Sequence, residues 1–374
     1  MLEDHKFIIF ALEHYNPLGM IRSLGCMGIN PIYISVKRRY EVAIKSKYIS
    51  KLHKVDSIQE GYDLLMREYG NEQIKPYLMF SDDKSVGFFD QHYDEWKDKF
   101  IGYNAGQADR INYFINKYEI QQCANRHGLT VLDSFIVNKN EPLPQNLWYP
   151  VITKDISPNV GNWKADVYIC QNEEELRGAM ERIAIDDIMV QHFIDKENEM
   201  TLEGYAINHG SDVHIVSQCT YKYLIPGYYS PYVDVQMFKY PDLEAKLASM
   251  FKEMGFEGVF EAEFIIDKDG TFYFTEINFR ASAWNYVGVV AGMPLPYLWC
   301  KGMENGYIDP ADRKQYKPFV AMSEVIDYAK RVEGGMISEP EWWRYFKEAE
   351  CTFIYNKDDI APFEEVYKNF DAFK

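Results

Sequence analysis

Four oxygen-bearing side chains stand among large apolar residues in the segment FEAEFIIDKDGTFYFTEINFR, residues 260–280. They are Glu261, Glu263, Glu276 and Asn278. Carboxylate and amide oxygens are the ligands that Mg²⁺ and Mn²⁺ prefer in proteins. Whether these oxygens can meet at one ion depends on how the strands of this segment pair.

The Asp-Gly dipeptide at 269–270 separates two apolar runs and predicts a β-hairpin, because a type I′ turn needs positive φ at both central residues. With these two residues as the loop, Glu263 lies opposite Glu276, and Glu261 lies opposite Asn278. Paired side chains of adjacent strands project from the same side of a sheet. The pattern therefore predicts that all four share one face.

Like charges that face each other destabilise a strand pair, so Glu263 opposite Glu276 calls for a counterion, which a divalent cation would supply. The same register pairs Ile265 with Phe274 and places Arg280 beside the ion. Two alternatives remain open. The acids could point to solvent from an ordinary amphipathic hairpin, and a slip to a three-residue loop would put the two glutamates on opposite faces.

The composition indicates a globular chain, since 374 residues suffice for two or three domains and 47% of them are hydrophobic. The net charge of −17 disfavours polyanionic partners, so we expect neither nucleic acid nor a membrane surface to bind. The six scattered cysteines form no pair with zinc-ligand or redox-motif spacing, which predicts reduced thiols in a cytoplasmic protein. We recognise neither a signal peptide nor an apolar stretch that could span a bilayer.

Apolar runs alternate with helical stretches at the N-terminus, which predicts an open parallel α/β sheet. The expected order is strand 6–12, helix 16–28, strand 31–36, helix 58–69, strand 77–80 and a helix from about 82. His14, Asn16 and Arg22 lie near the end of the first strand, where they could contact a ligand or serve as surface and capping residues.

The pattern changes near residue 105. There we expect a helix over 111–128, a strand over 129–137 and a second strand that ends at Lys154. A helix over 173–184, strands over 188–195, 201–207 and 213–223, and a helix over 242–254 should follow.

In this order the segments resemble the ATP-grasp superfamily over roughly residues 1–305. The motifs that carry the resemblance are YPVITK (149–154), VQHFI (190–194) and EAEFIID with EIN (261–278). Members of this superfamily place ATP between two α+β subdomains, next to an N-terminal α/β domain that helps to bind substrate.

The resemblance implies a mixed α/β and α+β chain of four parts. These are an N-terminal open parallel α/β domain (1–105), a lid-type subdomain with its linker helix (106–200), a metal-binding subdomain (201–305) and a C-terminal extension (306–374).

The resemblance also implies the residues that bind ATP. Lys154 and Lys117 match the lysines at the phosphates, and the segment SPNVGNWK (157–164) stands where many members have a glycine-rich loop. A solvated lysine at a strand end is the alternative for Lys154. The hinge strand whose backbone pairs with the adenine edge comprises Gln191, His192, Phe193 and Ile194, with the last two supplying the backbone groups.

Glu199 matches the acid that accepts from the ribose hydroxyls, or it is one more exposed acid in the charged run DKENE. Glu263, Glu276 and Asn278 match the metal ligands, the same residues that the register selects. Arg280 matches an arginine near the transferred phosphate. Lys222, for which a structural role is the alternative, could be a further cation near the γ-phosphate or the substrate carboxylate.

By resemblance, the chain is an ATP-dependent carboxylate–amine ligase, similar to D-aspartate ligases and to the large subunit of carbamoyl-phosphate synthase. With Mg²⁺ or Mn²⁺, it would activate a small carboxylic acid as an acyl phosphate and join it to an amine, or less often to a thiol. The Tyr-rich loop 223–232 would shape the acceptor site or pack simply as a lid. The tail from 306 would dock on the nucleotide domain or form the surface of a homodimer. The competing functions are an inactive nucleotide-sensing protein and an ATP-grasp kinase.

Overall fold

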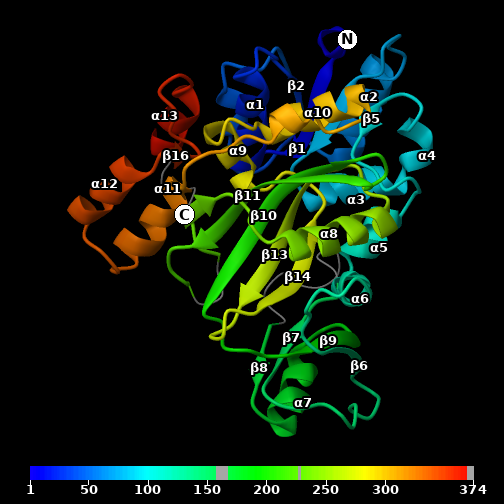
Figure 1. Cartoon of the computed structure of the whole chain (residues 1–374), viewed down its shortest axis with the longest axis vertical. Coiled ribbons are helices and arrows are strands. Elements are labelled where there is room, and N and C mark those ends of the chain that lie inside the picture. The colour runs from blue at the N-terminus through cyan, green and yellow to red at the C-terminus, as the bar shows by residue number, and fades with distance from the viewer. Residues whose placement is uncertain (157–166, 226–228, 369–374) are drawn as a thin grey trace.

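The computed structural model describes residues 1–156, 167–225 and 229–368, which form three sheets (Figure 1). The N-terminal sheet is parallel, with strand order β3-β2-β1-β4-β5. Its strands are β1 (Phe7–Leu12), β2 (Ile32–Val36), β3 (Lys51–Val55), β4 (Tyr77–Phe80) and β5 (Ile101–Gly102). The predicted open parallel sheet is confirmed.

Helices α1 (Tyr15–Gly25), α2 (Ile58–Tyr69), α3 (Asp83–Gln91) and α4 (Tyr93–Trp96) accompany this sheet. Side chains before the first turns fix where the helices begin, because they accept hydrogen bonds from otherwise unpaired backbone N–H groups. Ser57 accepts from the Glu60 N–H at the start of α2, and Asp82 accepts from the Ser85 N–H at the start of α3.

The central sheet has seven strands in the order β14-β13-β10-β11-β12-β15-β16. They are β10 (Asn198–Ile207), β11 (Asp212–Tyr221), β12 (Tyr232–Gln236), β13 (Gly258–Ile266), β14 (Phe272–Asn278), β15 (Phe319–Met322) and β16 (Cys351–Thr352). All neighbouring pairs are antiparallel except β15 with β16. Helices α8 (Pro241–Met254), α9 (Val287–Val290) and α10 (Leu295–Asn305) belong to the same part of the chain.

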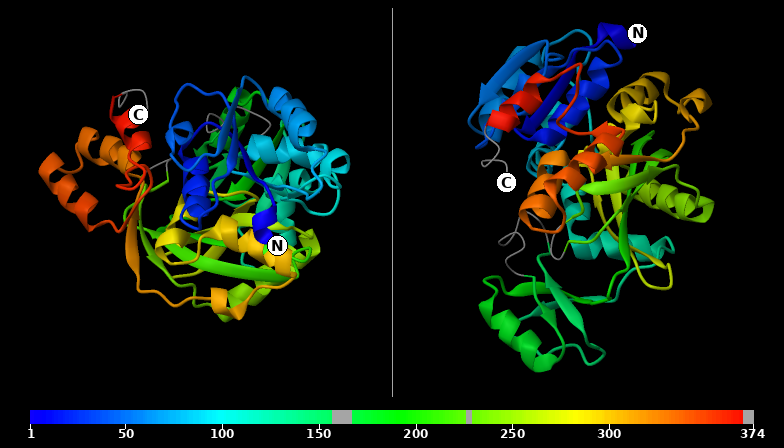
Figure 2. Two further views of the ribbon diagram at one scale, coloured as in Figure 1. Left: turned by 90° about the horizontal axis from the view of Figure 1, so that it is seen from above. Right: turned by 90° about the vertical axis from the view of Figure 1, so that its left-hand side faces the viewer.

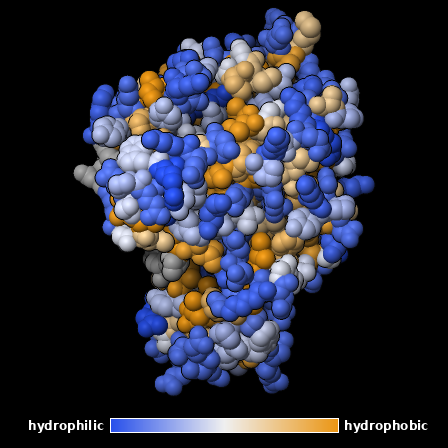
Figure 3. Space-filling view, turned by 60° about the vertical axis from the view of Figure 1, so that its left-hand side comes forward, coloured by the Kyte–Doolittle hydropathy of each residue, from blue (hydrophilic) through white to orange (hydrophobic). Residues whose placement is uncertain are grey.

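The third sheet is antiparallel, has the order β6-β9-β7-β8 and forms the small lobe at the bottom of Figure 1. It consists of β6 (Ser134–Asn138), β7 (Val151–Lys154), β8 (Ile169–Cys170) and β9 (Asp187–His192), with helix α7 (Glu173–Arg182). The lobe has an apolar core of its own, which includes Val151, Leu176 and Val190. In Figure 3 apolar residues gather where this lobe meets the larger body.

The helix expected over 111–128 is instead two helices, α5 (Arg110–Ile115) and α6 (Lys117–Arg126). Asn116 divides them, because its side-chain oxygen accepts from the N–H groups of Tyr118 and Glu119 and so starts a new helix. Lys117 thereby becomes the first residue of α6.

The C-terminal residues join two parts of the fold (Figure 2). Strands β15 and β16 extend the central sheet. Between them in sequence lie helix α11 (Glu324–Tyr328), a π-helical turn at Ala329–Glu333 and helix α12 (Glu339–Glu348). Helix α13 (Ala361–Lys368) follows β16. Figure 2 shows α13 beside the N-terminal sheet. Among the described residues, no helix combines the length and the apolarity needed to cross a membrane.

Candidate active site

The hairpin of β13 and β14 places the predicted acids on one face of the central sheet. Glu263 pairs with Glu276, and Glu261 pairs with Asn278, as the sequence predicts. Since paired side chains project from the same side, four oxygen-bearing groups lie on this face.

The turn of this hairpin differs from the prediction. Phe274 pairs with Phe264, so the expected pair of Ile265 with Phe274 is wrong. The backbone N–H of Asp267 donates to the carbonyl oxygen of Thr271 (3.2 Å), which makes the loop longer than the two predicted residues. At the turn the strands have therefore slipped by one residue.

A β-bulge at Thr275 reverses this slip. The pairing passes from Phe264 with Phe274 directly to Glu263 with Glu276, which leaves Thr275 as the extra residue of β14. The Thr275 hydroxyl donates to the carbonyl oxygen of Glu263 (2.9 Å). The bulge shifts the pairing back by the one residue lost at the turn, so the acids lie on one face as predicted.

Strand β10 brings another acid to this face, one that sequence reasoning missed. Glu203 pairs with Glu261, and Thr201 pairs with Glu263. Glu203 is completely buried, and its Oε1 accepts from the Ser282 hydroxyl (2.8 Å). Burial and the charge of Glu261 raise the pKa of Glu203 well above its usual value. The alternation of Glu199, Thr201 and Glu203 along β10 is the signal that could have revealed it.

Asn278 and Arg280 connect these acids to the N-terminal sheet. Asn278 Nδ2 donates to Glu261 (2.8 Å) and to Glu263 (2.7 Å), while its Oδ1 accepts from Arg280 Nη2 (3.0 Å). The Arg280 guanidinium also holds both carboxylate oxygens of Asp83, the first residue of α3, at 3.0 and 3.3 Å. Arg280 therefore lies at the junction of the two sheets, beside the predicted metal ligands.

The two facing glutamates differ in their electrostatic surroundings. Burial, followed by the charges of Glu276 and Glu261, raises the pKa of Glu263 well above its usual value. Lys117 Nζ donates to Glu276 Oε2 (2.9 Å), and its charge lowers the pKa of Glu276 although burial opposes this. A divalent cation would compensate the charge of Glu263, and the two carboxylates fit Mg²⁺ or Mn²⁺. Asn278 turns its amide nitrogen toward the acids here, so its oxygen would join them as a ligand only after the amide rotates away from Arg280.

Lys154 lies at the end of β7 and is held by a chain of amides. Its Nζ donates to Gln191 Oε1 (2.7 Å), Gln191 Nε2 donates to Gln121 Oε1 (2.9 Å), and Gln121 Nε2 reaches the carbonyl oxygen of Thr275 (3.4 Å). Burial, followed by the charge of Lys117, lowers the pKa of Lys154 to about 8. Because its hydrogen-bond partner is a neutral amide, a phosphate oxygen would stabilise its charged form.

Gln121 was not singled out from the sequence. It lies four residues after Lys117 on α6, so both side chains face the same side of the helix. That spacing is the signal that would have added it to the candidate nucleotide site.

The predicted hinge is the end of β9 and the residues that follow it. The N–H of Phe193 donates to the Pro150 carbonyl oxygen (2.9 Å), so in this arrangement it is not free to bind adenine, contrary to the expectation for Phe193. His192 stacks on Trp148, and its Nδ1 is buried without a hydrogen-bond partner in the described part of the chain. Because Val151 pairs with His192 and Ile152 with Gln191, the His192 side chain projects from the other face of the sheet than Gln191 and Lys154.

Glu199 belongs to β10 itself, which begins three residues earlier than expected. Lys196 donates to its carboxylate. Burial, followed by the charges of Glu199 and Glu263, raises the pKa of Tyr221 well above its usual value, which places the Tyr221 hydroxyl among these acids.

Lys222 does not join the other candidates. Thr201 pairs with Cys219, so Cys219 and Tyr221 share the face of the acids, and Lys222 projects from the other face. There its Nζ forms an ion pair with Asp234 (2.8 Å). We therefore remove Lys222 from the candidate catalytic residues.

Two loops named in the sequence analysis are only partly within the described residues. The segment SPNVGNWK at 157–164 lies outside them, as do residues 226–228 of the Tyr-rich loop. Of the remaining loop residues, the Tyr229 hydroxyl lies 2.5 Å from that of Tyr15, the first residue of α1. The Tyr223 hydroxyl donates to Asp327 of the C-terminal extension (2.5 Å).

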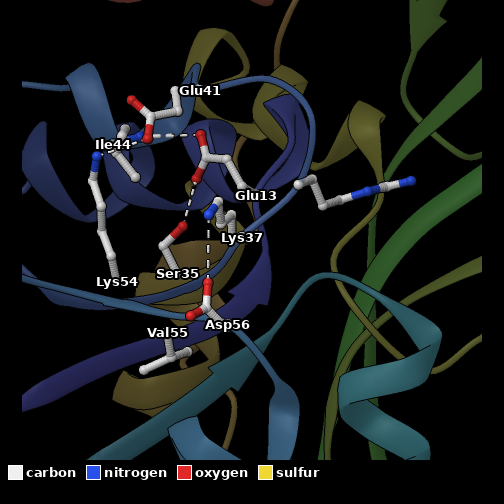
Figure 4. Close-up of a pocket in the computed structure, with 9 residues that line it drawn as sticks. Glu13, Ser35, Lys37, Glu41, Ile44, Lys54, Val55 and Asp56 are labelled. Carbon is white, nitrogen blue, oxygen red and sulfur yellow. Dashed lines mark hydrogen bonds and ion pairs between the residues drawn. The ribbon is translucent and has the colours of Figure 1, made fainter.

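A pocket of about 250 Å³ lies at the carboxyl ends of β1, β2 and β3 (Figure 4). In it Lys37 pairs with Asp56 (3.6 Å) and Lys54 pairs with Glu41 (2.7 Å), while Glu13 forms part of the wall. None of the predicted ATP or metal residues lines this pocket.

No protein-family model matches the sequence, and no curated protein is detectably similar to it. Solved structures are similar to it in fold. N5-carboxyaminoimidazole synthetase from Staphylococcus aureus, complexed with ADP, has a TM-score of 0.65 at 13% identity, with 98% of each chain covered. L-amino acid ligase from Bacillus licheniformis has a TM-score of 0.60 at 14% identity, with 82% of this chain and 78% of that chain covered.

The biotin carboxylase domain of Hydrogenobacter thermophilus 2-oxoglutarate carboxylase, in complex with MgADP, has a TM-score of 0.64 at 15% identity, with 84% of this chain and 73% of that chain covered. The chain therefore has the ATP-grasp fold that the sequence motifs predict.

Proposed function

We propose that this protein is an ATP-dependent ligase that joins a small carboxylic acid to an amine. The observation that carries the proposal is that lysines of the small lobe and of α6 lie beside the acids of the central sheet. Lys154 of the small lobe and Lys117 of α6 lie at Glu276 of the central sheet, where Glu263 and Asn278 complete the donor set. The fold shared with ligases and carboxylases supports the same conclusion.

In the proposed mechanism the chain mainly positions charges. Lys154 and Lys117 bind phosphate oxygens, and the hinge from Gln191 to Ile194 holds the adenine, with Ile194 supplying the backbone edge in place of the engaged Phe193 amide. Glu199 accepts from the ribose. Phosphoryl transfer requires little covalent help from a protein, so positioning and neutralisation of charge provide most of the rate.

Glu263, Glu276 and Asn278 would hold one or two Mg²⁺ ions, whose charge would offset that of the triphosphate. A substrate carboxylate oxygen bonds to the γ-phosphorus, the bond from that phosphorus to the bridging oxygen breaks, and ADP leaves. Arg280, fixed by Asp83, stabilises the developing acyl phosphate. The amine nitrogen then bonds to the acyl carbon, loses its proton, and inorganic phosphate leaves.

We also propose the four-part division at residues 105, 200 and 305 as the functional units, with the extension joined to the metal-binding part through β15 and β16. A cytoplasmic location and small-molecule substrates accord with this function. The acceptor is an amine in our proposal, and a thiol is the alternative acceptor.

The test is a panel of carboxylic acids incubated with ATP, Mg²⁺ and hydroxylamine. An acyl phosphate reacts with hydroxylamine to give a hydroxamate, so the correct acid gives hydroxamate and ADP in equal amounts. The Glu276→Gln variant should give neither. ADP with a stable phosphorylated alcohol would identify a kinase instead, and nucleotide binding without ADP release for any acid would identify a sensing protein.

A further inference from the structure

Three potential metal ligands meet where α6 packs against α8, apart from the proposed active site. Cys123 lies on α6, His127 caps the end of that helix, and Glu253 lies on α8. One ligand atom from each residue lies within 4.8 Å of the other two. The first two residues are four apart, a spacing that places both side chains on one face of a helix.

The partners of His127 and Glu253 match the outer contacts found around metal ligands. His127 Nδ1 lies 2.8 Å from the Ser249 hydroxyl, while Nε2 faces Glu253 Oε2 at 2.7 Å. Arg126 donates to the other oxygen of Glu253. In metal sites the ring nitrogen that does not bind metal is fixed by such a contact, which orients the imidazole. Here Ser249 fixes Nδ1 and leaves Nε2 directed at the carboxylate.

The third ligand is a buried thiol. Cys123 is fully buried, and its sulfur lies within reach of the His127 ring and the Glu253 carboxylate. A bound metal ion removes the proton from a coordinating thiol, because its charge stabilises the thiolate. His127 is partly exposed and Glu253 lies at the surface, which gives an ion access.

We propose that Cys123, His127 and Glu253 form a binding site for a transition-metal ion of the Zn²⁺ class, with water as the fourth ligand. Thiolate sulfur, imidazole nitrogen and carboxylate oxygen are the ligands of zinc, and three protein ligands with an open position are a common zinc arrangement. The ion would fix α6 to α8. Since α6 also carries Lys117 and Gln121, the ion would hold in place the helix that supplies part of the candidate nucleotide site.

Co²⁺ is the probe for the test, because its absorption reports its ligands. The metal-free full chain is titrated with Co²⁺ in the presence of excess Mg²⁺, which occupies the oxygen ligands of the active site. We expect one equivalent of tetrahedral Co²⁺ with a thiolate-to-cobalt charge-transfer band, and displacement of that Co²⁺ by Zn²⁺. Cys123→Ser should lose the band, whereas Cys26→Ser, which removes an exposed thiol elsewhere, should keep it.

His127→Asn provides a second variant at a less buried position, in case Cys123→Ser does not fold. It should lose tetrahedral Co²⁺ binding while its circular dichroism stays unchanged. Ser249→Ala should weaken Co²⁺ binding about 10-fold, as loss of an outer contact does. Absence of the charge-transfer band in the unmodified protein, its persistence in Cys123→Ser, or its loss in Cys26→Ser would overturn the proposal.

Discussion

Two buried charge networks in this molecule differ in how completely their charges are paired. In the first, Arg22 of α1 is 1% exposed and donates to Asp359 and to the carbonyl oxygens of Phe353, Ile354 and Asp359, at 2.7 to 3.0 Å. Asp359 also accepts from the Ser46 hydroxyl (2.8 Å). Arg22 and Asp359 pair directly, and each has several further partners.

The second network, on the central sheet, has an excess of negative charge. Glu203, Glu261, Glu263 and Glu276 lie on one face, with Arg280 and Lys117 as the nearest cations named above. The comparison teaches that buried charge alone does not indicate a ligand site. Arg22, which the sequence left as a possible ligand contact, is a structural residue, whereas the unequal charges of the acidic face leave room for a cation.

The largest expected effect concerns the paired network. Arg22→Met should lower the free energy of unfolding by about 3–5 kcal/mol, because it leaves Asp359 buried without its cation. Chemical denaturation measures this loss. Arg39→Met, which removes an arginine that lies over Tyr40, is the control and should change stability little. A loss below about 1 kcal/mol for Arg22→Met would mean that the pairing does not stabilise the fold.

The acidic network should respond in activity and not in stability. Glu276→Gln should reduce Mg²⁺-dependent ADP formation by at least about 100-fold, since removal of a ligand costs no less than removal of its outer contacts. Circular dichroism should be unchanged. Glu41→Gln, which removes an acid that pairs with Lys54 in the pocket of the N-terminal sheet, should keep full activity. Full turnover by Glu276→Gln at saturating Mg²⁺ would contradict the ligand assignment.

Lys154 tests whether the lysines beside the acids bind phosphate. Lys154→Ala should weaken binding of a non-hydrolysable ATP analogue about 10-fold, the effect of losing one hydrogen bond to a charged group. Calorimetric titration with Mg²⁺ present measures this. Lys222→Ala should bind the analogue as tightly as the unmodified protein, because Lys222 pairs with Asp234 on the other face. Equal affinities in all three proteins would move the phosphate contact elsewhere.

The pH dependence of ATP binding sharpens the same point. The pKa of Lys154 is lowered to about 8, so the lysine is protonated below that pH and loses its charge above it. A neutral amine binds phosphate less well, and affinity should therefore fall as pH rises above about 8. Lys154→Arg stays charged in this range and should show a flatter profile. A decline of the same size in Lys154→Arg would assign the titration to another group.

Much of the fold could be predicted from local patterns. Helix 58–69 and strand 77–80 have the bounds that apolar spacing predicts, because buried parallel strands are continuously apolar and amphipathic helices repeat near 3.6 residues. Asn116 was misjudged as a helix interior, since its cap depends on side-chain geometry that periodicity does not contain. The metal site proposed on α6 was likewise missed, because Glu253 is far from Cys123 in sequence and approaches it only through helix packing.

The sequence by itself determined which side chains alternate along each strand. It therefore determined that Glu261 and Glu263 project from one side of β13, and that Glu276 and Asn278 project from one side of β14. Only the tertiary structure decided that these two sides belong to the same face of the sheet. The local turn favours a register one residue away, and the bulge at Thr275 restores the pairing next to the point where the Phe274 N–H donates to the carbonyl oxygen of Thr130 (2.8 Å). This contact joins the hairpin to a segment that is distant in sequence. Alternation within one hairpin could not specify the register that the contact accompanies.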